Sequence, residues 1–378
     1  MHQTVASPIT VSETQATSPR LLSLDALRGF DMLWIIGAED FVNGLRKISG
    51  TGAIKFVADQ LEHAAWEGLH FEDLIFPLFL FIVGISLVFS LTRTLQQSAG
   101  DVAVKRIVRR AALLYLLGIF YYGGFSTPFN DIRLLGVLQR IALCYLFAAL
   151  LFCYLKPGSL VTVCVGLLIG YWALMTFVPV PGVGSGNFAE GKNLANYIDK
   201  QYLPLRKWNG DYDPEGLLST LPAIATCLLG VFGGLLLKNK SVSDQKKVVC
   251  LAGAGVVGVG LGWLWGLQFP VIKKIWPSSF VLVTGGYSAL LLALFYQVVE
   301  IWKWQKWAQP FVWIGVNPIT IYMAVNLINF GAIARRLVGG DLNRYCGVYG
   351  DLVVAVTSLI LEFWFLNFLY RRKIFLRL

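Results

Sequence analysis

The sequence contains little charge for its length. Aspartate, glutamate, lysine and arginine together make up 14% of its 378 residues, whereas 56% are hydrophobic. Soluble domains carry about 25% charged residues, and a soluble fold of this size has too little interior to enclose the remaining apolar surface. The composition therefore excludes an ordinary soluble protein and predicts that membrane lipid covers part of the chain.

Several common motifs are also missing. The six cysteines form no CxxC pair and show no metal-ligand spacing, so neither a redox motif nor a zinc site is expected. Residues 1–20 lack the basic start, apolar run and cleavage site of a signal peptide; they are polar, and we interpret them as a disordered cytoplasmic tail. The chain shows no internal repeat, which weakens the case for a transporter built from inverted repeats.

The hydrophobic residues gather in segments long enough to cross about 30 Å of hydrocarbon as helices. They predict an all-α integral membrane protein, a polytopic bundle of about ten (ten or eleven) transmembrane helices in a single domain over residues 21–378. Asn317–Pro318 predicts a break in the ninth segment. The predicted spans are 26–45, 73–92, 108–124, 132–155, 158–180, 215–237, 248–267, 278–300, 310–330 and 348–370.

The net charge of +10 is distributed as a membrane topology signal. Basic residues stand in short runs between the apolar segments, and such runs mark cytoplasmic loops. They are not gathered on one soluble face, so no nucleic-acid partner is expected. The bias places both termini in the cytoplasm and makes the loops at about 46–72 and 181–214 external.

Ionisable residues inside or beside the spans are the informative ones in a membrane protein. Asp25, Arg28 and Asp31 are spaced by three in the first span, so the arginine can pair with either acid on one helix face. A purely structural ion pair explains this spacing equally well. Glu39 and Asp40 follow about 16–18 Å further along the helix axis, and we expect them near the external face.

Two histidines, His63 and His70, lie in the first external loop. His63 is followed by Trp66 and then by Asp73, where the chain enters the membrane. This surrounding favours an imidazole in a cleft at the membrane surface. A lone loop histidine more often has no role, and without further ligands no metal is expected.

Polar side chains also fall within later spans. Arg140 lies inside the predicted span 132–155, where a guanidinium needs either an acid or a ligand phosphate as its partner. Asn317 adds a polar group to the ninth span, where it serves either helix packing or a site.

Six stretches, which occur in order across essentially the whole chain, carry a family resemblance. They are RLLSLDALRG at 20–29, HAAWEGLHFEDLIFPLFLFIVG at 63–84, GVLQR at 136–140, VPVPG at 178–182, DPEGLLSTL at 213–221 and YRRKIF at 370–375. Together they resemble the heparan-alpha-glucosaminide N-acetyltransferase family and its bacterial relatives, within the transmembrane acyltransferase superfamily. The resemblance implies an enzyme that transfers acetyl from cytoplasmic acetyl-CoA, its co-substrate, to the amine of glucosamine or a glucosamine-containing saccharide.

The resemblance also implies roles for particular residues. The family's active-site histidine lies in the stretch that matches His63 to Trp66, which gives His63 the role of general base or acetyl acceptor. A functional asparagine of the family stands in a Phe-Val-Asn string that Asn43 matches, whereas a gapless alignment places Glu39 there. Asp73 or Glu39 is then the acid that orients the imidazole. A compact bacterial form without the large luminal domain of the animal enzymes, in the plasma membrane and as a homodimer, is the expected setting.

Acetyl-CoA must be held by its phosphates, which arginine and lysine bind well. The candidates are Arg28, Arg109, Arg110 and Lys238 near the inner face, with Arg140 deeper, although positive-inside anchoring explains the loop residues too. The candidates for binding the sugar are Asp40, Asp213, Glu215 and Asn317. Since acetyl-CoA is cytoplasmic and His63 is predicted to be external, the reaction requires a passage for the pantetheine arm through the bundle.

Two other functions stay open at this stage. An amino-sugar permease without chemistry suits a bundle with polar residues inside it, and release of thiol from acetyl-CoA would exclude it. A membrane O-acyltransferase acting on a glycan hydroxyl would give an ester, which mild base cleaves, instead of an amide.

Overall fold

The computed structural model describes residues 21–48, 51–97 and 100–376, and the predicted tail at 1–20 lies outside them. Within the described residues the chain is helical throughout, with two isolated β-bridges and no strand. The all-α prediction is confirmed for this part of the chain.

Long helices form most of the body of the molecule, and shorter helices complete it. The long helices are α1 (Leu22–Ile48), α3 (Phe71–Gln97), α4 (Gly100–Tyr121), α5 (Val137–Tyr154), α6 (Pro157–Phe177), α8 (Thr220–Lys238), α9 (Asp244–Gly266), α10 (Ser278–Tyr296) and α15 (Gly350–Arg371). The shorter ones are α2 (Gly52–Gln60), α7 (Leu194–Tyr202), α11 (Gln309–Gly315), α12 (Pro318–Leu327), α13 (Phe330–Val338) and α14 (Asp341–Cys346).

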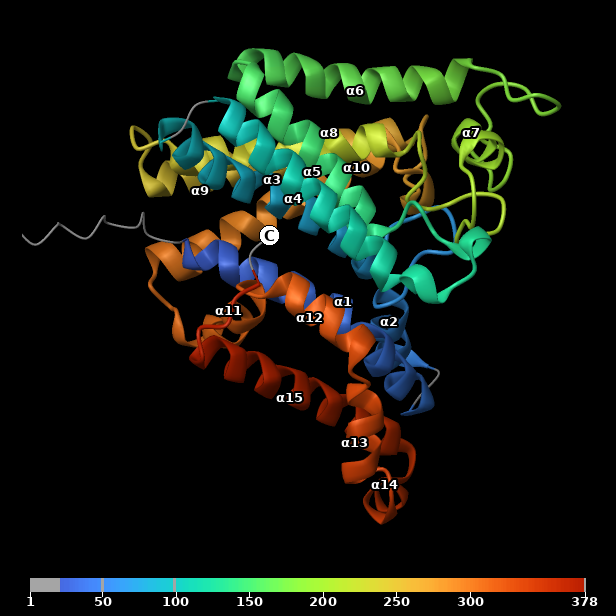
Figure 1. Cartoon of the computed structure of the whole chain (residues 1–378), viewed down its shortest axis with the longest axis vertical. Helices are drawn as coiled ribbons and strands as arrows, with labels where there is room; N and C mark the ends of the chain where they lie inside the picture. The colour runs from blue at the N-terminus through green and yellow to red at the C-terminus, as the bar shows by residue number, and fades with distance from the viewer. Residues whose placement is uncertain (1–20, 49–50, 98–99, 377–378) are drawn as a thin grey trace, which may run out of the picture.

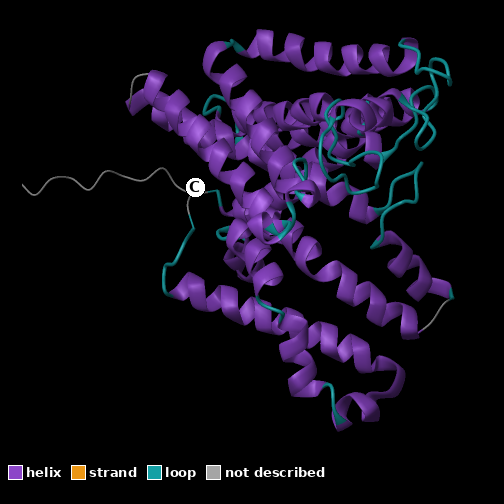
Figure 2. Ribbon diagram, turned by 45° about the vertical axis from the view of Figure 1, so that its right-hand side comes forward, coloured by secondary structure: helices purple, strands orange, loops and turns teal. Residues whose placement is uncertain are grey.

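The long helices run back and forth between two ends of the bundle (Figure 1). α1 begins and α15 ends on the left of the view, which we call the terminal end. α2 and α7 lie on the right, and the long loops gather there as well (Figure 2). We call this second end the site end, because His63 lies in the loop between α2 and α3.

Seven helical segments are long and apolar enough to cross a membrane, and the bent pair formed by α11 and α12 makes an eighth. Each of the ten predicted spans overlaps a helix, but α1 and α4, which carry several charged residues, are not among these candidates. The structure therefore supports a multi-pass membrane protein, while the count of ten spans and the cytoplasmic position of the termini stay predictions.

Three details differ from or refine the predicted segments. α11 and α12 meet at 67°, which confirms the break at Asn317–Pro318. α5 begins at Val137 rather than at 132, because Arg133 is turned outward into an ion-pair cluster. The loops predicted at 46–72 and 181–214 contain helices of their own, α2 and α7.

α3 and α8 pack closely because glycines stand where they cross. A Cβ atom on Gly84 would overlap the backbone carbonyl of Cys227, and one on Gly230 would overlap that of Phe81. Small residues allow such close approach of helices where the hydrophobic effect does not drive association. The contact fixes α3, which carries Asp73 at its first turn, within the bundle.

Replacing Gly84 with alanine is therefore expected to destabilise the protein, because the added methyl group has no space. Overpacking of this kind costs about 1–3 kcal/mol, and we expect a lower melting temperature in detergent. Gly260→Ala is the matched control, since a Cβ atom there meets nothing within 4 Å. A Gly84→Ala variant that melts at or above the temperature of the control would contradict the proposed packing.

Candidate functional site

Asp73 organises the loop that precedes α3. Its Oδ2 accepts hydrogen bonds from the backbone N–H groups of His70, at 2.9 Å, and Ala64, at 3.1 Å. The His70 contact is that of a capping residue in the first turn that reaches back to the start of its helix. The Asp73 side chain is fully buried, so these bonds compensate part of the cost of burying its charge.

His63 stands against the other oxygen of the same carboxylate. Its Nδ1 lies 3.1 Å from Asp73 Oδ1, and its side chain is 55% exposed. A proton on Nδ1 therefore faces Asp73 and leaves Nε2 as the basic nitrogen. The structure thus brings an imidazole against a carboxylate that can orient it, from two residues that the sequence separates by ten positions.

Lys273 completes this group, although sequence reasoning did not single it out. Its Nζ lies 2.9 Å from Nδ1 and 3.0 Å from Nε2 of His63, and 3.8 Å from Asp73 Oδ1. Lys273 belongs to a short 3-10 turn (Lys273–Ile275) that follows α9, 210 residues from His63 along the chain. In the sequence it is one of several basic loop residues, and no local signal distinguishes it.

Contacts between three loops hold this group in place at the site end. The Gly68 N–H donates to the carbonyl of Val271 at 2.9 Å, and the Trp66 indole donates to the carbonyl of Phe188 at 3.0 Å. The Tyr171 hydroxyl donates to the carbonyl of Ile275. Segments far apart in the sequence are therefore fixed around His63.

An ion-pair cluster lies in the loops of the same end. Arg133 donates to both carboxylate oxygens of Asp213, at 2.6 and 2.8 Å, and to Glu215 at 2.5 Å. Its guanidinium also lies over the rings of Tyr122 and Trp208. Two of the three acids predicted to bind the sugar, Asp213 and Glu215, are thus buried here and paired with a cation that the sequence did not indicate.

Arg140 lies near this cluster rather than in the middle of a span. It stands in the first turn of α5, fully buried, and donates to Ser219 and to the carbonyl of Gly216 at 3.3 Å. Its guanidinium lies over the ring of Trp276. Its position at the site end separates it from the basic residues that were grouped with it.

The other predicted phosphate partners are distributed over three helices. Arg28 on α1 donates to Asp25, to the carbonyl of Gly315 and to Ser86 on α3. On α4, Arg109 is exposed, and Arg110 lies over the Tyr145 ring. Lys238 ends α8, where it lines an open hollow.

Two of the predicted site residues on α1 face a different cleft. Asp40 and Asn43 line it with charged residues of α1, α13 and α15, and its walls do not include His63, Asp73 or Lys273. The side chain of Glu39 lies outside the part of the structure that is described. Asn317 is buried at the start of α12 and donates to the carbonyl of Ile374 at 3.1 Å.

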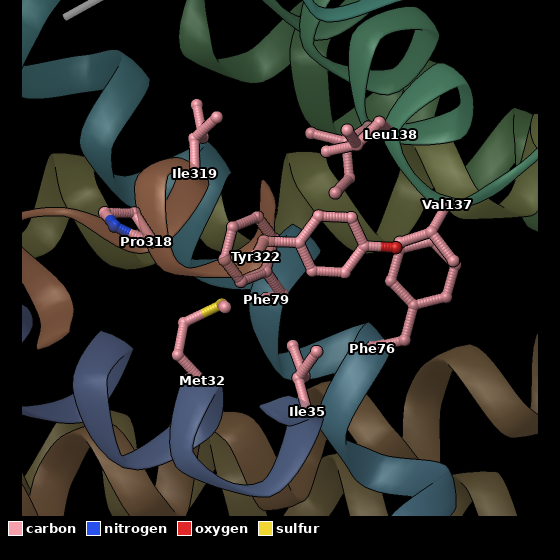
Figure 3. Close-up of a pocket in the computed structure, with 10 residues that line it drawn as sticks. Met32, Ile35, Phe76, Phe79, Val137, Leu138, Pro318, Ile319 and Tyr322 are labelled. Carbon is pink, nitrogen blue, oxygen red and sulfur yellow. The ribbon is translucent and has the colours of Figure 1, made fainter. Parts of the chain in front are cut away.

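A small apolar cavity of about 20 Å³ lies between α1, α3, α5 and α12. Figure 3 shows side chains of all four helices converging on it. The lining residues are Met32, Ile35, Phe76, Phe79, Val137, Leu138, Ile141, Pro318, Ile319 and Tyr322. Phe76 and Phe79 place the cavity along α3 between Asp73 and Ser86, the partner of Arg28.

With this geometry in view, comparison with known proteins is decisive. Residues 20–258 match the family described as heparan-alpha-glucosaminide N-acetyltransferase, catalytic. The chain belongs to this family. The match includes His63 and Asp73, whereas Lys273 lies beyond it.

Two relatives carry the name of the family. Heparan-alpha-glucosaminide N-acetyltransferase from Homo sapiens is 28% identical over 418 residues, which cover 95% of this chain and 60% of the human protein. The protein of that name from Mus musculus is 26% identical over 423 residues, with 96% and 61% coverage. The chain therefore spans about three fifths of the length of the curated relatives it matches, and the predicted family is confirmed.

Asp199 gives the loop cluster a testable pH dependence. It is buried in α7 and accepts the backbone N–H groups of Leu217, at 2.8 Å, and Asp213, at 3.3 Å. Burial raises its pKa from 3.8 to about 6, so the folded state holds a proton that the unfolded state releases between these values. The contribution of Asp199 to the unfolding free energy therefore falls as pH rises from 4 to 6, by about 3 kcal/mol.

Asp199→Asn is expected to remove this decline. The melting temperature of the variant minus that of the native protein should therefore increase between pH 4 and pH 7. The side-chain amide of the variant places an N–H donor against the Asp213 N–H, which lowers stability, but this loss is the same at every pH. The slope of the difference against pH therefore decides the test. Parallel melting curves for the two proteins would contradict the buried, protonated carboxyl.

Proposed function

We propose that this protein is a transmembrane N-acetyltransferase, which moves acetyl from cytoplasmic acetyl-CoA to the amine of glucosamine or a glucosamine-containing saccharide. The observation that carries the proposal is the exposed imidazole of His63 held on the buried carboxylate of Asp73, in a chain of this acetyltransferase family. The setting that we propose is a bacterial plasma membrane, with the site end external. We propose that the protein forms a homodimer there.

In the proposed reaction His63 acts as the general base. Asp73 accepts from Nδ1 and thereby fixes the tautomer in which Nε2 carries the lone pair. Nε2 takes a proton from the sugar amine as its nitrogen attacks the thioester carbonyl. The imidazolium formed is stabilised by the Asp73 carboxylate and then returns its proton to the departing thiolate.

Direct transfer in a complex of both substrates is the route that we favour over an acetyl-imidazole. Half of the His63 side chain is exposed, so a sugar amine can approach the imidazole from solvent. Direct attack converts an encounter of two molecules into a reaction between neighbours, which is a large source of catalysis. It also leaves no acetyl group bound to the enzyme between turnovers.

We propose that the pantetheine arm passes where the small apolar cavity of Figure 3 lies, with the lining side chains moving apart to admit it. The cavity lies along α3 between the Arg28 end and Asp73, as required for a thioester that reaches His63 from the terminal end. Arg28, Arg109, Arg110 and Lys238 are the proposed partners of the CoA phosphates in that direction. The cleft with Asp40 and Asn43 is the proposed binding surface for the remaining sugar units.

Replacing His63 with alanine should abolish transfer, because general-base catalysis contributes about 10²–10⁴-fold in rate. The measurement is the release of thiol from acetyl-CoA by purified protein with glucosamine, alongside binding of CoA to the same variant. We expect CoA binding to be retained. His70→Gln is the matched control, since the amide can keep the contact that His70 Nδ1 makes with the Glu62 carbonyl at 2.9 Å.

Normal turnover by the His63→Ala variant would remove the imidazole from the mechanism. Equal loss of rate in the His70→Gln control would show instead that disturbance of the loop is responsible.

Filling the cavity should weaken binding of acetyl-CoA. Ile319→Trp places an indole among the lining residues, and a steric cost of about 1.4 kcal/mol already changes affinity tenfold. We therefore expect the KM for acetyl-CoA to rise at least about tenfold, with the KM for glucosamine nearly unchanged. Ile360→Trp, at an exposed position of α15, is the control; identical kinetics for the two variants would exclude this route.

A further inference from the structure

The ammonium of Lys273 lies beside the imidazole to which the proposed function assigns the reaction. Its Nζ is 2.9 Å from His63 Nδ1 and 3.0 Å from His63 Nε2, so it lies beside the ring between the two nitrogens. Lys273 contacts both His63 and Asp73. The neighbouring Lys274 points elsewhere, to Glu190 at 3.4 Å and to the ring of Trp66.

Acetyl transfer to an amine has a requirement that His63 and Asp73 do not meet. When the amine attacks the thioester, the carbonyl oxygen gains negative charge. Donors fixed beside that oxygen usually make the largest single contribution to catalysis of this kind. The Asp73 carboxylate cannot supply a hydrogen-bond donor, and the His63 imidazole is occupied by the amine.

We propose that Lys273 is a catalytic residue that donates a hydrogen bond to the thioester carbonyl oxygen as it becomes an oxyanion. This assignment rests on the proposed function. The attacking amine is hydrogen-bonded to Nε2, and its nitrogen forms a bond to the carbonyl carbon. The carbonyl oxygen therefore lies within reach of the Lys273 ammonium, which is already 3.0 Å from Nε2. The incoming amine replaces Lys273 at Nε2, and rotation of the lysine's terminal bonds carries Nζ to the oxygen.

The proposed step balances without any further reactant. The sugar ammonium first loses one proton to solvent. The amine nitrogen then forms the C–N bond, its second proton passes to His63 Nε2, and the carbonyl π electrons move to the oxygen that Lys273 binds. The oxyanion re-forms the C=O bond, the C–S bond breaks, and the thiolate takes the proton from His63, so the products are an amide, free CoA thiol and one proton in solution.

The surroundings of Lys273 suit a donor that must be in place before the reaction. Its turn is anchored by Ile272 and Ile275, which are at most 1% exposed, and by the Tyr171 hydroxyl bound to the Ile275 carbonyl. Its own side chain is 20% exposed. Burial lowers the pKa of its ammonium, while the carboxylates of Asp73, Glu72 and Glu215 act in the opposite direction. A partly desolvated cation acts on an oxyanion more strongly than one in water.

The first test replaces Lys273 with methionine, which keeps the unbranched stem and removes the charge. We expect kcat to fall about 10²–10³-fold, with the KM for acetyl-CoA within a factor of about three of the native value. Lys274→Met is the matched control and should keep kcat within about threefold. A Lys273→Met protein with native kcat would overturn the assignment while leaving the proposed function intact, whereas a native protein without transfer would refute that function itself.

The second test compares one variant before and after a charge is restored chemically. It can be used even if Lys273→Met does not fold. Treatment of Lys273→Cys with 2-bromoethylamine restores an ammonium on a side chain of lysine length. Recovery of at least about one tenth of native kcat after alkylation would support the assignment, because a merely structural loss would not return with the charge. The native protein, whose cysteines include the exposed Cys250, is alkylated in parallel; no recovery in the variant would overturn the proposal.

Discussion

The buried carboxylate of Asp73 is the constraint on which the site depends. One oxygen accepts two backbone N–H groups of the preceding loop, and the other faces His63 and, at 3.8 Å, Lys273. A buried charge is tolerated only when it is paired and hydrogen-bonded, so the same interactions that stabilise the start of α3 also fix the imidazole. Folding of the loop and orientation of the His63 imidazole therefore depend on the same carboxylate.

The rest of the site end is built on the same physical basis. Arg133 is buried with Asp213 and Glu215 around it, and removal of one partner from such a cluster leaves an uncompensated charge. This cluster and Asp199 hold the loop before α8, while direct hydrogen bonds tie the His63 loop to the loop of Lys273. The bundle beneath supplies rigid helices at close spacing, as the glycine contact between α3 and α8 shows.

Sequence patterns predict the helices well because lipid demands long apolar segments. Pro318 produces the predicted break, since it cannot continue a helical hydrogen-bond ladder. The start of α5 was predicted five residues too early, because Leu134 and Leu135 look like helix interior while Arg133 is bound to acids of a loop 80 residues away. Such a pairing has no local signature.

The site likewise contains residues that the sequence indicates and residues that only the fold reveals. His63 was identified through the family resemblance, and Asp73 through its place at the start of a span, so the structure brings together two residues that were expected to act together. Lys273 could not be found in this way, because its neighbours in the sequence only indicate a loop. Asp213 and Glu215 were among the candidates for binding the sugar, and the arginine that pairs with them becomes visible only in the fold.

The most direct measurement is an electron cryomicroscopy structure of the protein with CoA bound. The account predicts the CoA sulfur about 3–4 Å from the space between His63 Nε2 and Lys273 Nζ, with the pantetheine arm in the cavity between α1, α3, α5 and α12 and the nucleotide toward the terminal end. Density that places CoA on a surface without a passage to His63 would contradict it.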